Sequence, residues 1–189
     1  MSIDQVKALK PKNKALFLDR DGVINEDYGH VWRIADFDLV QGVTEVIKSA
    51  MKKNYKIIVV TNQAGIGKGM YKESDFDALT EHMKGLFECQ GCTIDSIYFC
   101  PCHPTEGKGS YLQDSFDRKP NPGMLLRAKD DFNLDMSASV LIGDKITDIQ
   151  AGKSAGVSIN ILYQPRSIEM SSSLWCEKIT DLKQALGYL

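Results

Sequence analysis

Residues 16–22 read Leu-Phe-Leu-Asp-Arg-Asp-Gly, an apolar run that ends in two carboxylates two positions apart. Such a run is typical of a buried β-strand that leads into a turn. Side chains alternate along a strand, so the spacing predicts Asp19 and Asp21 on one side and Arg20 on the other. Neighbouring carboxylates repel each other unless a proton or a cation lies between them. We therefore expect a hard metal ion with oxygen ligands at the end of this strand.

Two alternatives to a metal site fit the same residue types. Asp and Gly are common in solvated turns, so an isolated Asp-x-Asp-Gly does not separate a turn from a site. A calcium loop is disfavoured, because it needs Asp or Asn at its fifth position and Gly at its sixth, where this chain has Val23 and Ile24.

Outward from this run, short apolar stretches alternate with helical patterns. Strands are predicted at 15–18, 57–60, 94–99, 140–142 and 157–162. Helices are predicted at 74–88, at 122–131 with Pro122 in the first turn, and at 147–155. In the first of these, Ser74 and Asp77 resemble a capping pair, and one face carries Phe76, Leu79, Met83, Leu86 and Phe87.

This alternation predicts an α/β fold: a doubly wound, Rossmann-like parallel sheet with helices on both faces and ligands at the carboxyl ends of the strands. Two long loops, 23–41 and 101–119, are expected to border the site. Neither has room for a separate cap domain. We expect one domain over 1–189, with a core of about 14–163 and an open site suited to a small metabolite.

Composition narrows the possible partners. The 189 residues are 43% hydrophobic and carry a formal net charge of -2 with scattered Lys and Arg, which disfavours nucleic-acid binding. Residues 1–14 lack the apolar stretch of a signal peptide, and no run suits a membrane span, so a cytoplasmic location is expected. We also expect a monomer. Five cysteines without a secretory signal favour free thiols or metal ligands over disulfides.

The second strand leads into Thr61 and Asn62, whose hydroxyl and amide can donate hydrogen bonds to phosphate oxygens, although both residues are also ordinary turn formers. The nearby Gly-Ile-Gly-Lys-Gly at 65–69 fits neither nucleotide-binding glycine motif: Asn62 and Gly69 break one, and Met70 breaks the other.

Charged residues follow the later elements. Arg118 and Lys119 precede Pro120, which favours an extended Lys119, although a basic pair in a loop is often only solvated. After the strand at 140–142, Asp144 either caps the next helix or ligates a metal, and Asp148, one helical turn later, can face the same way.

Four of these sites together resemble the motifs of the haloacid dehalogenase superfamily, in their order and in their placement at strand ends. They are residues 19–22, Thr61 with Asn62, Lys119, and Gly143 and Asp144 with Asp148. The resemblance covers 15–163 and implies an Mg²⁺-dependent phosphatase with Asp19 as nucleophile and Asp21 as general acid and base. It places the metal on Asp19, Asp144 and the backbone carbonyl of Asp21. The implied substrate-binding residues are Asp27, Tyr28, Gly29, His30, Thr61, Asn62, Gln63, Arg118, Lys119 and Lys145.

Within the superfamily, the stretches LFLDRDGVIN, VVTNQAGI, CPCHP, RKPNPGML and IGDKITDIQA look most like phosphatases that remove the 7-phosphate of heptose 1,7-bisphosphates. That resemblance implies a role in making nucleotide-activated heptose for lipopolysaccharide or capsule. Phosphatase domains that act on histidinol phosphate are similar and are the nearest alternative. A phospho-accepting receiver module explains less, because the boundary at Val60 and Thr61 has no acceptor Asp.

The chain departs from the heptose phosphatases at their structural zinc site. Those proteins hold zinc with a Cys-x-His pair and a later Cys-x-Cys pair, whereas this chain has Ser115 and Asp117 at the second pair. Cys100, Cys102, His103 and Asp117 could form an improvised site, and Cys89 with Cys92 is another conceivable pair. With so few thiolates, a four-ligand structural zinc is disfavoured, and the loop could be ordered by packing instead.

Overall fold

A computed structural model describes residues 12–165 and 176–189. Six parallel strands form one sheet in the order β3-β2-β1-β4-β5-β6. The strands are β1 Lys14–Leu18, β2 Tyr55–Asn62, β3 Ser96–Cys100, β4 Val140–Gly143, β5 Ile159–Tyr163 and β6 Glu177–Ile179. The helices are α1 Val43–Lys52, α2 Ala64–Gly67, α3 Glu73–Cys89, α4 Gly123–Phe132 and α5 Ile146–Ser154, with 3-10 turns at Ile34–Asp36, Gly109–Tyr111, Met136–Ala138 and Leu182–Tyr188.

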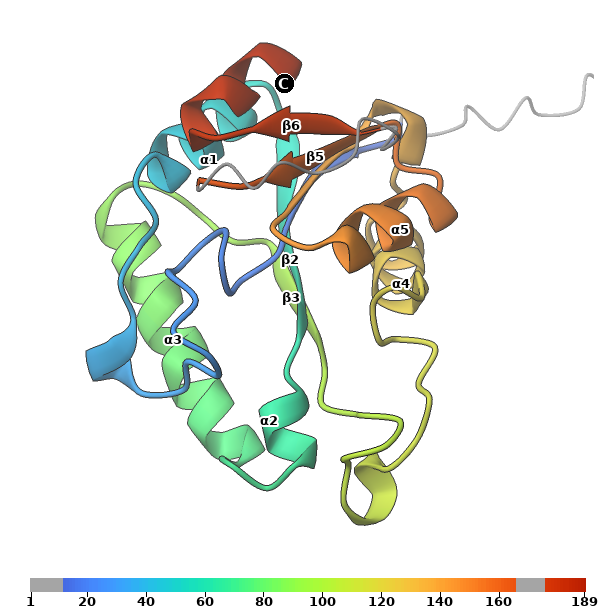
Figure 1. Ribbon diagram of the computed structural model, residues 1–189. Helices are drawn as coiled ribbons and strands as arrows, with labels where there is room; N and C mark the ends of the chain where they lie inside the picture. Colours follow the sequence, from blue (N-terminus) through green and yellow to red (C-terminus); the bar gives the residue numbers. More distant parts are fainter. Residues whose placement is uncertain (1–11, 166–175) are drawn as a thin grey trace, which may run out of the picture.

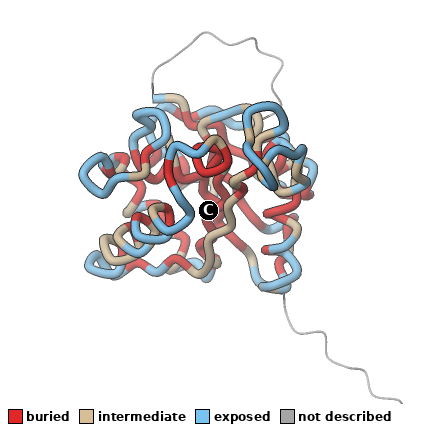
Figure 2. Tube along the Cα trace, turned by 90° about the horizontal axis from the view of Figure 1, so that it is seen from below, coloured by how far each residue is buried: buried red, intermediate tan, exposed pale blue. Residues whose placement is uncertain are grey.

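Helices cover both faces of the sheet, with α1 and α3 on one side and α4 and α5 on the other (Figure 1). Alternation along the strands assigns each side chain to one of two cores. Leu16 and Leu18 pack with α1 and α3, whereas Phe17 packs with α4 and α5. The buried residues gather in the centre of the molecule and the exposed ones at its rim (Figure 2). The predicted doubly wound α/β fold is confirmed, and no separate cap domain is present among the described residues.

The predicted elements match the structure with shifts of one or two residues at their ends, where hydrogen bonding rather than hydropathy sets the boundary. Four of the five residues expected on one face of α3 are buried. Leu79, Met83 and Phe87 share a core with the partly buried Leu86, and Phe76 packs in a smaller cluster with Ile66 and Tyr71. The capping prediction for α3 is wrong. The helix begins at Glu73, and the carboxylate of Asp75, not Asp77, accepts the backbone N–H of Lys72 at 2.8 Å.

Register places the motif-bearing strand ends side by side. Leu18 at the end of β1 pairs with Val59 of β2 on one side and Ile142 of β4 on the other. The backbone N–H of Asp19 continues this ladder to the carbonyl of Ile142 at 3.0 Å. Residues that follow β1, β2 and β4 therefore meet at one edge of the sheet, as expected for a parallel fold.

The expectation about a signal peptide concerns residues 1–14, and residues 1–11 of that stretch lie outside the described residues. Within the described ranges, no helix combines the length and the apolar character needed to cross a membrane.

Candidate active site

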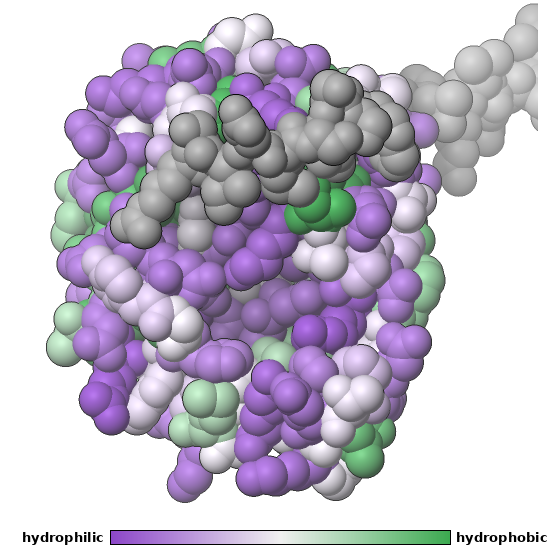
Figure 3. Space-filling view, viewed as in Figure 1, coloured by the Kyte–Doolittle hydropathy of each residue, from purple (hydrophilic) through white to green (hydrophobic). Residues whose placement is uncertain are grey.

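A cleft of about 440 Å³ lies at the carboxyl edge of the sheet. The face seen in Figure 3 has a central hollow whose visible walls are mostly hydrophilic. The predicted site residues that line the cleft are Asp19, Asp21, Asp27, Gly29, His30, Thr61, Asn62, Gln63, Arg118, Lys119, Lys145 and Asp148. Residues from both long loops thus border the cleft, as predicted.

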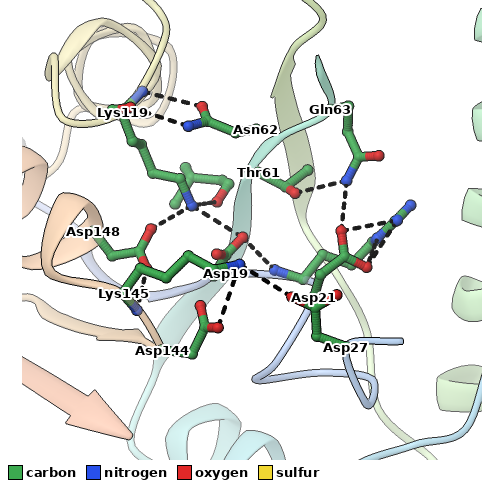
Figure 4. A network of polar contacts seen from close by, with 12 residues as sticks. Asp19, Asp21, Asp27, Thr61, Asn62, Gln63, Lys119, Asp144, Lys145 and Asp148 are labelled. Atoms are coloured by element: carbon green, nitrogen blue, oxygen red, sulfur yellow. Dashed lines mark hydrogen bonds and ion pairs between the residues drawn. The ribbon is translucent and has the colours of Figure 1, made fainter. Parts of the chain in front are cut away.

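Lys119 lines the cleft and reaches toward Asp19 and Asp148 (Figure 4). Its ammonium lies 2.9 Å from Oδ1 of Asp19 and 2.6 Å from Oδ1 of Asp148, and it donates to the carbonyl of Val60 at 2.8 Å. All three side chains are buried. Burial disfavours the ammonium, but the two carboxylates outweigh it and raise the pKa of Lys119. Lys119 is therefore a fixed positive charge beside Asp19.

Asp144 completes an acidic group with Asp19 and Asp148. These three carboxylates each offer an oxygen within 4.8 Å of the others, and they are the one group of three potential metal ligands among the described residues. Oδ1 of Asp144 is buried without a hydrogen-bond partner. Burial, reinforced by Asp19, raises the pKa of Asp144 to about 7. An unpaired buried carboxylate oxygen beside two other carboxylates fits a divalent cation with oxygen ligands.

Gly22 gives Asp144 the space it occupies. The glycine has φ +89°, and a Cβ at this position would lie 2.5 Å from Oδ2 of Asp144. Asp144 does not cap α5, so that alternative is wrong. Instead, Oδ2 of Asp148 accepts the backbone N–H of Lys145 at 2.9 Å, the bond that begins the helix.

The arrangement at Asp21 differs from the alternation predicted for this strand end. The chain turns directly after Asp19, and the guanidinium of Arg20 contacts both oxygens of Asp21, at 2.9 and 3.0 Å. Asn25 and Gln63 donate to the same carboxylate at 3.1 and 2.9 Å. The Asp21 carboxylate is thus held by N–H donors from Arg20, Asn25 and Gln63.

Thr61 and Asn62 occupy the last two positions of β2, and they have different contacts. The amide of Asn62 pairs with the backbone of Lys119 in both directions: Nδ2 donates to its carbonyl at 3.0 Å, and Oδ1 accepts its N–H at 3.1 Å. Thr61 Oγ1 accepts from Nε2 of Gln63 at 2.9 Å, which leaves its O–H as a donor. Asn62 therefore positions Lys119, while Thr61 retains a proton to donate into the cleft.

The predicted rim around residues 27–30 is only partly assembled. Asp27 pairs with the ammonium of Lys145 at 3.1 Å and accepts the N–H of Gly29 at 2.9 Å. Burial works against ionisation, but these two contacts lower the pKa of Asp27. Gly29 and His30 line the cleft, both with positive φ. Tyr28 does not line it: the side chain is 62% exposed, and its hydroxyl donates to Asp38.

Sequence reasoning missed several cleft residues, among them Lys68, Tyr71 and His103. Lys68 pairs with Glu106 of the second long loop, and Arg118 of that loop donates to the carbonyl of Cys102 at 3.0 Å. The only signal for Lys68 and Tyr71 was their closeness to Thr61 in the sequence. The direction of these two side chains depends on α2, and a helix of four residues is too short to show a hydrophobic periodicity in the sequence.

The second long loop is held by packing and hydrogen bonds. Cys100 and Cys102 are buried in the core with α4, and Cys102 Sγ accepts from Gln113. His103 Nδ1 accepts the backbone N–H groups of Thr105 and Glu106 at 3.3 and 3.1 Å, and Asp117 pairs with Arg127 at 3.3 Å. Cys100, Cys102, His103 and Asp117, the improvised set considered for zinc, therefore pack in the core or have protein partners.

Comparisons with known proteins agree with this geometry. The HAD-hydrolase-like family profile matches residues 116–163. The chain is 55% identical, over 94% of each chain, to D-glycero-alpha-D-manno-heptose-1,7-bisphosphate 7-phosphatase of Burkholderia mallei. It is 44% identical to D-glycero-beta-D-manno-heptose-1,7-bisphosphate 7-phosphatase of Haemophilus influenzae, over 80% of this chain and 82% of the relative.

The fold is shared with a crystal structure of D,D-heptose 1,7-bisphosphate phosphatase from B. bronchiseptica, complexed with magnesium and phosphate. That likeness has a TM-score of 0.76 at 24% identity and covers 93% of this chain and 99% of the other. With 55% identity to a curated relative over 94% of its length, the chain belongs to the haloacid dehalogenase superfamily and, within it, to the family of D-glycero-D-manno-heptose-1,7-bisphosphate 7-phosphatases.

Proposed function

We propose that this protein hydrolyses the 7-phosphate of a D-glycero-D-manno-heptose 1,7-bisphosphate through an aspartyl phosphate on Asp19. The observation that carries the proposal is the group of three carboxylates formed by Asp19, Asp144 and Asp148 at the open cleft, with Asp19 and Asp148 both paired to the buried Lys119 ammonium. The relatives named above support the choice of substrate.

In the first step, an oxygen of Asp19 attacks phosphorus, and the bond from phosphorus to the sugar oxygen breaks. The contacts of Asp19 with the Lys119 ammonium and the Arg20 N–H both use Oδ1, at 2.9 and 2.7 Å, so we assign Oδ2 as the nucleophile. Asp21 in its protonated form gives its proton to the departing sugar oxygen. The products are the heptose 1-phosphate and a phosphorylated Asp19.

In the second step, water attacks the phosphorus of the phosphorylated Asp19. Asp21, now ionised, accepts a proton from that water, and the bond between phosphorus and the Asp19 oxygen breaks. Inorganic phosphate leaves, Asp19 returns as a carboxylate, and Asp21 is again protonated for the next cycle. Thr61 would hold a phosphoryl oxygen through its remaining O–H, and the Lys119 ammonium, whose contacts are with Asp19, Asp148 and the carbonyl of Val60, would offset the charge of the phosphoryl group.

Mg²⁺ is the metal that this donor set fits. Asp19, Asp144 and the backbone carbonyl of Asp21 would hold it, and it would supply positive charge that offsets the charge of the nucleophile and the phosphate. Asp148 has less freedom to serve as a ligand, because one of its oxygens contacts Lys119 and the other accepts the N–H of Lys145.

The remote part of the substrate would lie against Arg118, Lys145 and the loop residues Asp27, Gly29 and His30, all of which line the cleft. Binding energy from a doubly charged sugar can orient the reacting end, so a monophosphate should lose rate as well as affinity. We further propose a cytoplasmic monomer that acts in the synthesis of nucleotide-activated heptose for lipopolysaccharide or capsule.

The test compares kcat/KM for a heptose 1,7-bisphosphate with kcat/KM for histidinol phosphate, in the wild type and in Arg118→Ala. We expect a strong preference for the bisphosphate and a drop in that preference in the variant. Equal or reversed preference would leave a phosphatase of another substrate, with histidinol phosphate as the first alternative. Unchanged kinetics of Arg118→Ala would remove Arg118 from substrate recognition.

A further inference from the structure

Tyr71 has a fixed position at the cleft wall. The residue is 6% exposed and its ring stacks on Trp32, with centroids 6.1 Å apart and planes 10° apart. A Cβ on Gly65 would lie 2.2 Å from the ring, so only glycine leaves room for it there. Its hydroxyl donates to Oε1 of Gln63 at 2.5 Å. Burial raises the pKa of Tyr71 to about 12, which keeps the hydroxyl protonated and able to donate.

The Tyr71 hydroxyl holds the oxygen end of the Gln63 amide, and the Asp21 carboxylate accepts from its nitrogen end. Oε1 accepts from Tyr71. The amide nitrogen Nε2 donates to Oδ2 of Asp21 and to Oγ1 of Thr61, both at 2.9 Å (Figure 4). A flipped amide would place its oxygen against the Asp21 carboxylate, which is also an acceptor, and lose the hydrogen bond to Asp21. Gln63 is 1% exposed, so water does not replace these partners at low cost.

The two oxygens of Asp21 have unequal surroundings. Oδ1 accepts N–H groups from Nε and Nη2 of Arg20 and from Nδ2 of Asn25, all within the turn that follows β1. Oδ2 also accepts from Nη2 of Arg20. Its other donor is Nε2 of Gln63, a residue that lines the cleft. Of the two oxygens, Oδ2 is therefore the one whose contacts include a side chain of the cleft wall, and its position depends on Gln63.

We propose that Tyr71 is a positioning residue which, through Gln63, orients Oδ2 of Asp21 as the oxygen that delivers the proton to the leaving group. The proposal rests on the proposed function, in which Asp21 protonates the departing sugar oxygen. Tyr71 itself need not touch the substrate.

Leaving-group dependence separates this role from a structural one. In Tyr71→Phe the ring and its stacking on Trp32 are kept, and only the hydroxyl is lost. For the heptose bisphosphate, whose alkoxide needs a proton to leave, we expect kcat/KM to fall about 3- to 10-fold, the effect of one hydrogen bond. For 4-nitrophenyl phosphate, whose phenolate leaves without a proton, kcat/KM should stay unchanged, because this ratio reports only the steps up to release of the leaving group.

Tyr98→Phe is the matched control. Its hydroxyl also makes a short hydrogen bond, to Asp131 at 2.6 Å, but it lies outside the cleft lining. We expect this variant to match the wild type on both substrates. Equal losses on both substrates for Tyr71→Phe, or no loss on the sugar, would overturn the proposal.

A double-mutant cycle tests the route through Gln63. In a Gln63→Leu background, adding Tyr71→Phe should cause no further loss on the heptose bisphosphate, because the group through which Tyr71 acts is already absent. An additive loss would overturn the proposal. A wild type that hydrolyses 4-nitrophenyl phosphate but not the sugar would instead overturn the proposed substrate, and a wild type inactive on both would overturn both proposals.

Discussion

Lys119→Met should destabilise the metal-free protein strongly. The ammonium is 3% exposed and lies 2.9 Å from Asp19 and 2.6 Å from Asp148, so its removal leaves two buried carboxylates without their counter-ion. Met keeps most of the side-chain volume, which limits the effect of an added cavity. Removal of one partner from a buried ion pair typically costs about 3–5 kcal/mol. We expect a loss of this size in the free energy of unfolding.

Urea denaturation in chelator, near pH 8, measures this loss. With a urea slope of about 2 kcal/mol/M, the unfolding midpoint should fall by about 1.5–2.5 M. The double variant Lys119→Met/Asp148→Asn should recover part of the loss, because it removes one of the two uncompensated charges while Asn can still accept the N–H of Lys145.

Lys56→Met is the exposed control. Lys56 pairs with Asp95 at 2.8 Å, but its side chain is 39% exposed, so its removal should change stability by less than about 1 kcal/mol. If Lys119→Met also loses less than about 1 kcal/mol, or if the double variant is no more stable than the single one, Lys119 does not balance buried charge as described.

Three further predictions concern the acid, the metal and the turn. Asp21→Asn should slow turnover strongly and let the phosphoenzyme accumulate with an activated aryl ester, because hydrolysis lacks its base; a rapid-quench experiment without accumulation would argue against that role. Burial and Asp19 raise the pKa of Asp144 from 3.8 to about 7, so between about pH 4 and 7 the folded metal-free protein binds a proton that the unfolded chain lacks. Its unfolding temperature should therefore fall as pH rises from about 5 to about 8, and Mg²⁺ should raise it more at the higher pH; a gain independent of pH would count against Asp144 as a ligand. Gly22→Ala places a Cβ 2.5 Å from Oδ2 of Asp144 and should raise the Mg²⁺ concentration needed for half-maximal activity, whereas Gly91→Ala, with a similar φ of +74° and no atom within 4 Å of its Cβ, should leave it unchanged. Equal metal dependence in both variants would refute the steric argument.

The sequence predicted β1 to β5 well because their runs are rich in apolar residues, a signal that does not depend on distant residues. β6 was not predicted: Glu177–Ile179 is three residues long and two of them are charged, so only its pairing with β5 defines it. The capping residues predicted for α3 and α5 lie one or more positions from the observed ones. Several polar residues near the start of each helix could have accepted a backbone N–H, and the sequence does not select among them.

The acidic cluster was likewise predictable, because strand order and register bring the ends of β1, β2 and β4 together. The local sequence pattern did not show which hydrogen-bond partner each of these side chains would bind once they lie close together. The Asp21 carboxylate binds the guanidinium of Arg20, and Asn62 binds the backbone of Lys119. Each of these outcomes depends on turns and loops whose side-chain directions are set by long-range contacts.

The position of bond cleavage tests the central claim most directly. Phosphorus NMR of a heptose 1,7-bisphosphate incubated with the protein and Mg²⁺ distinguishes the anomeric phosphate from the 7-phosphate, and Asp19→Asn is the control, since the amide keeps the shape but not the nucleophile. We predict that the 7-phosphate signal is replaced by inorganic phosphate while the anomeric phosphate remains, and that Asp19→Asn leaves both signals intact. Loss of the anomeric phosphate, or equal turnover by Asp19→Asn, would contradict the account.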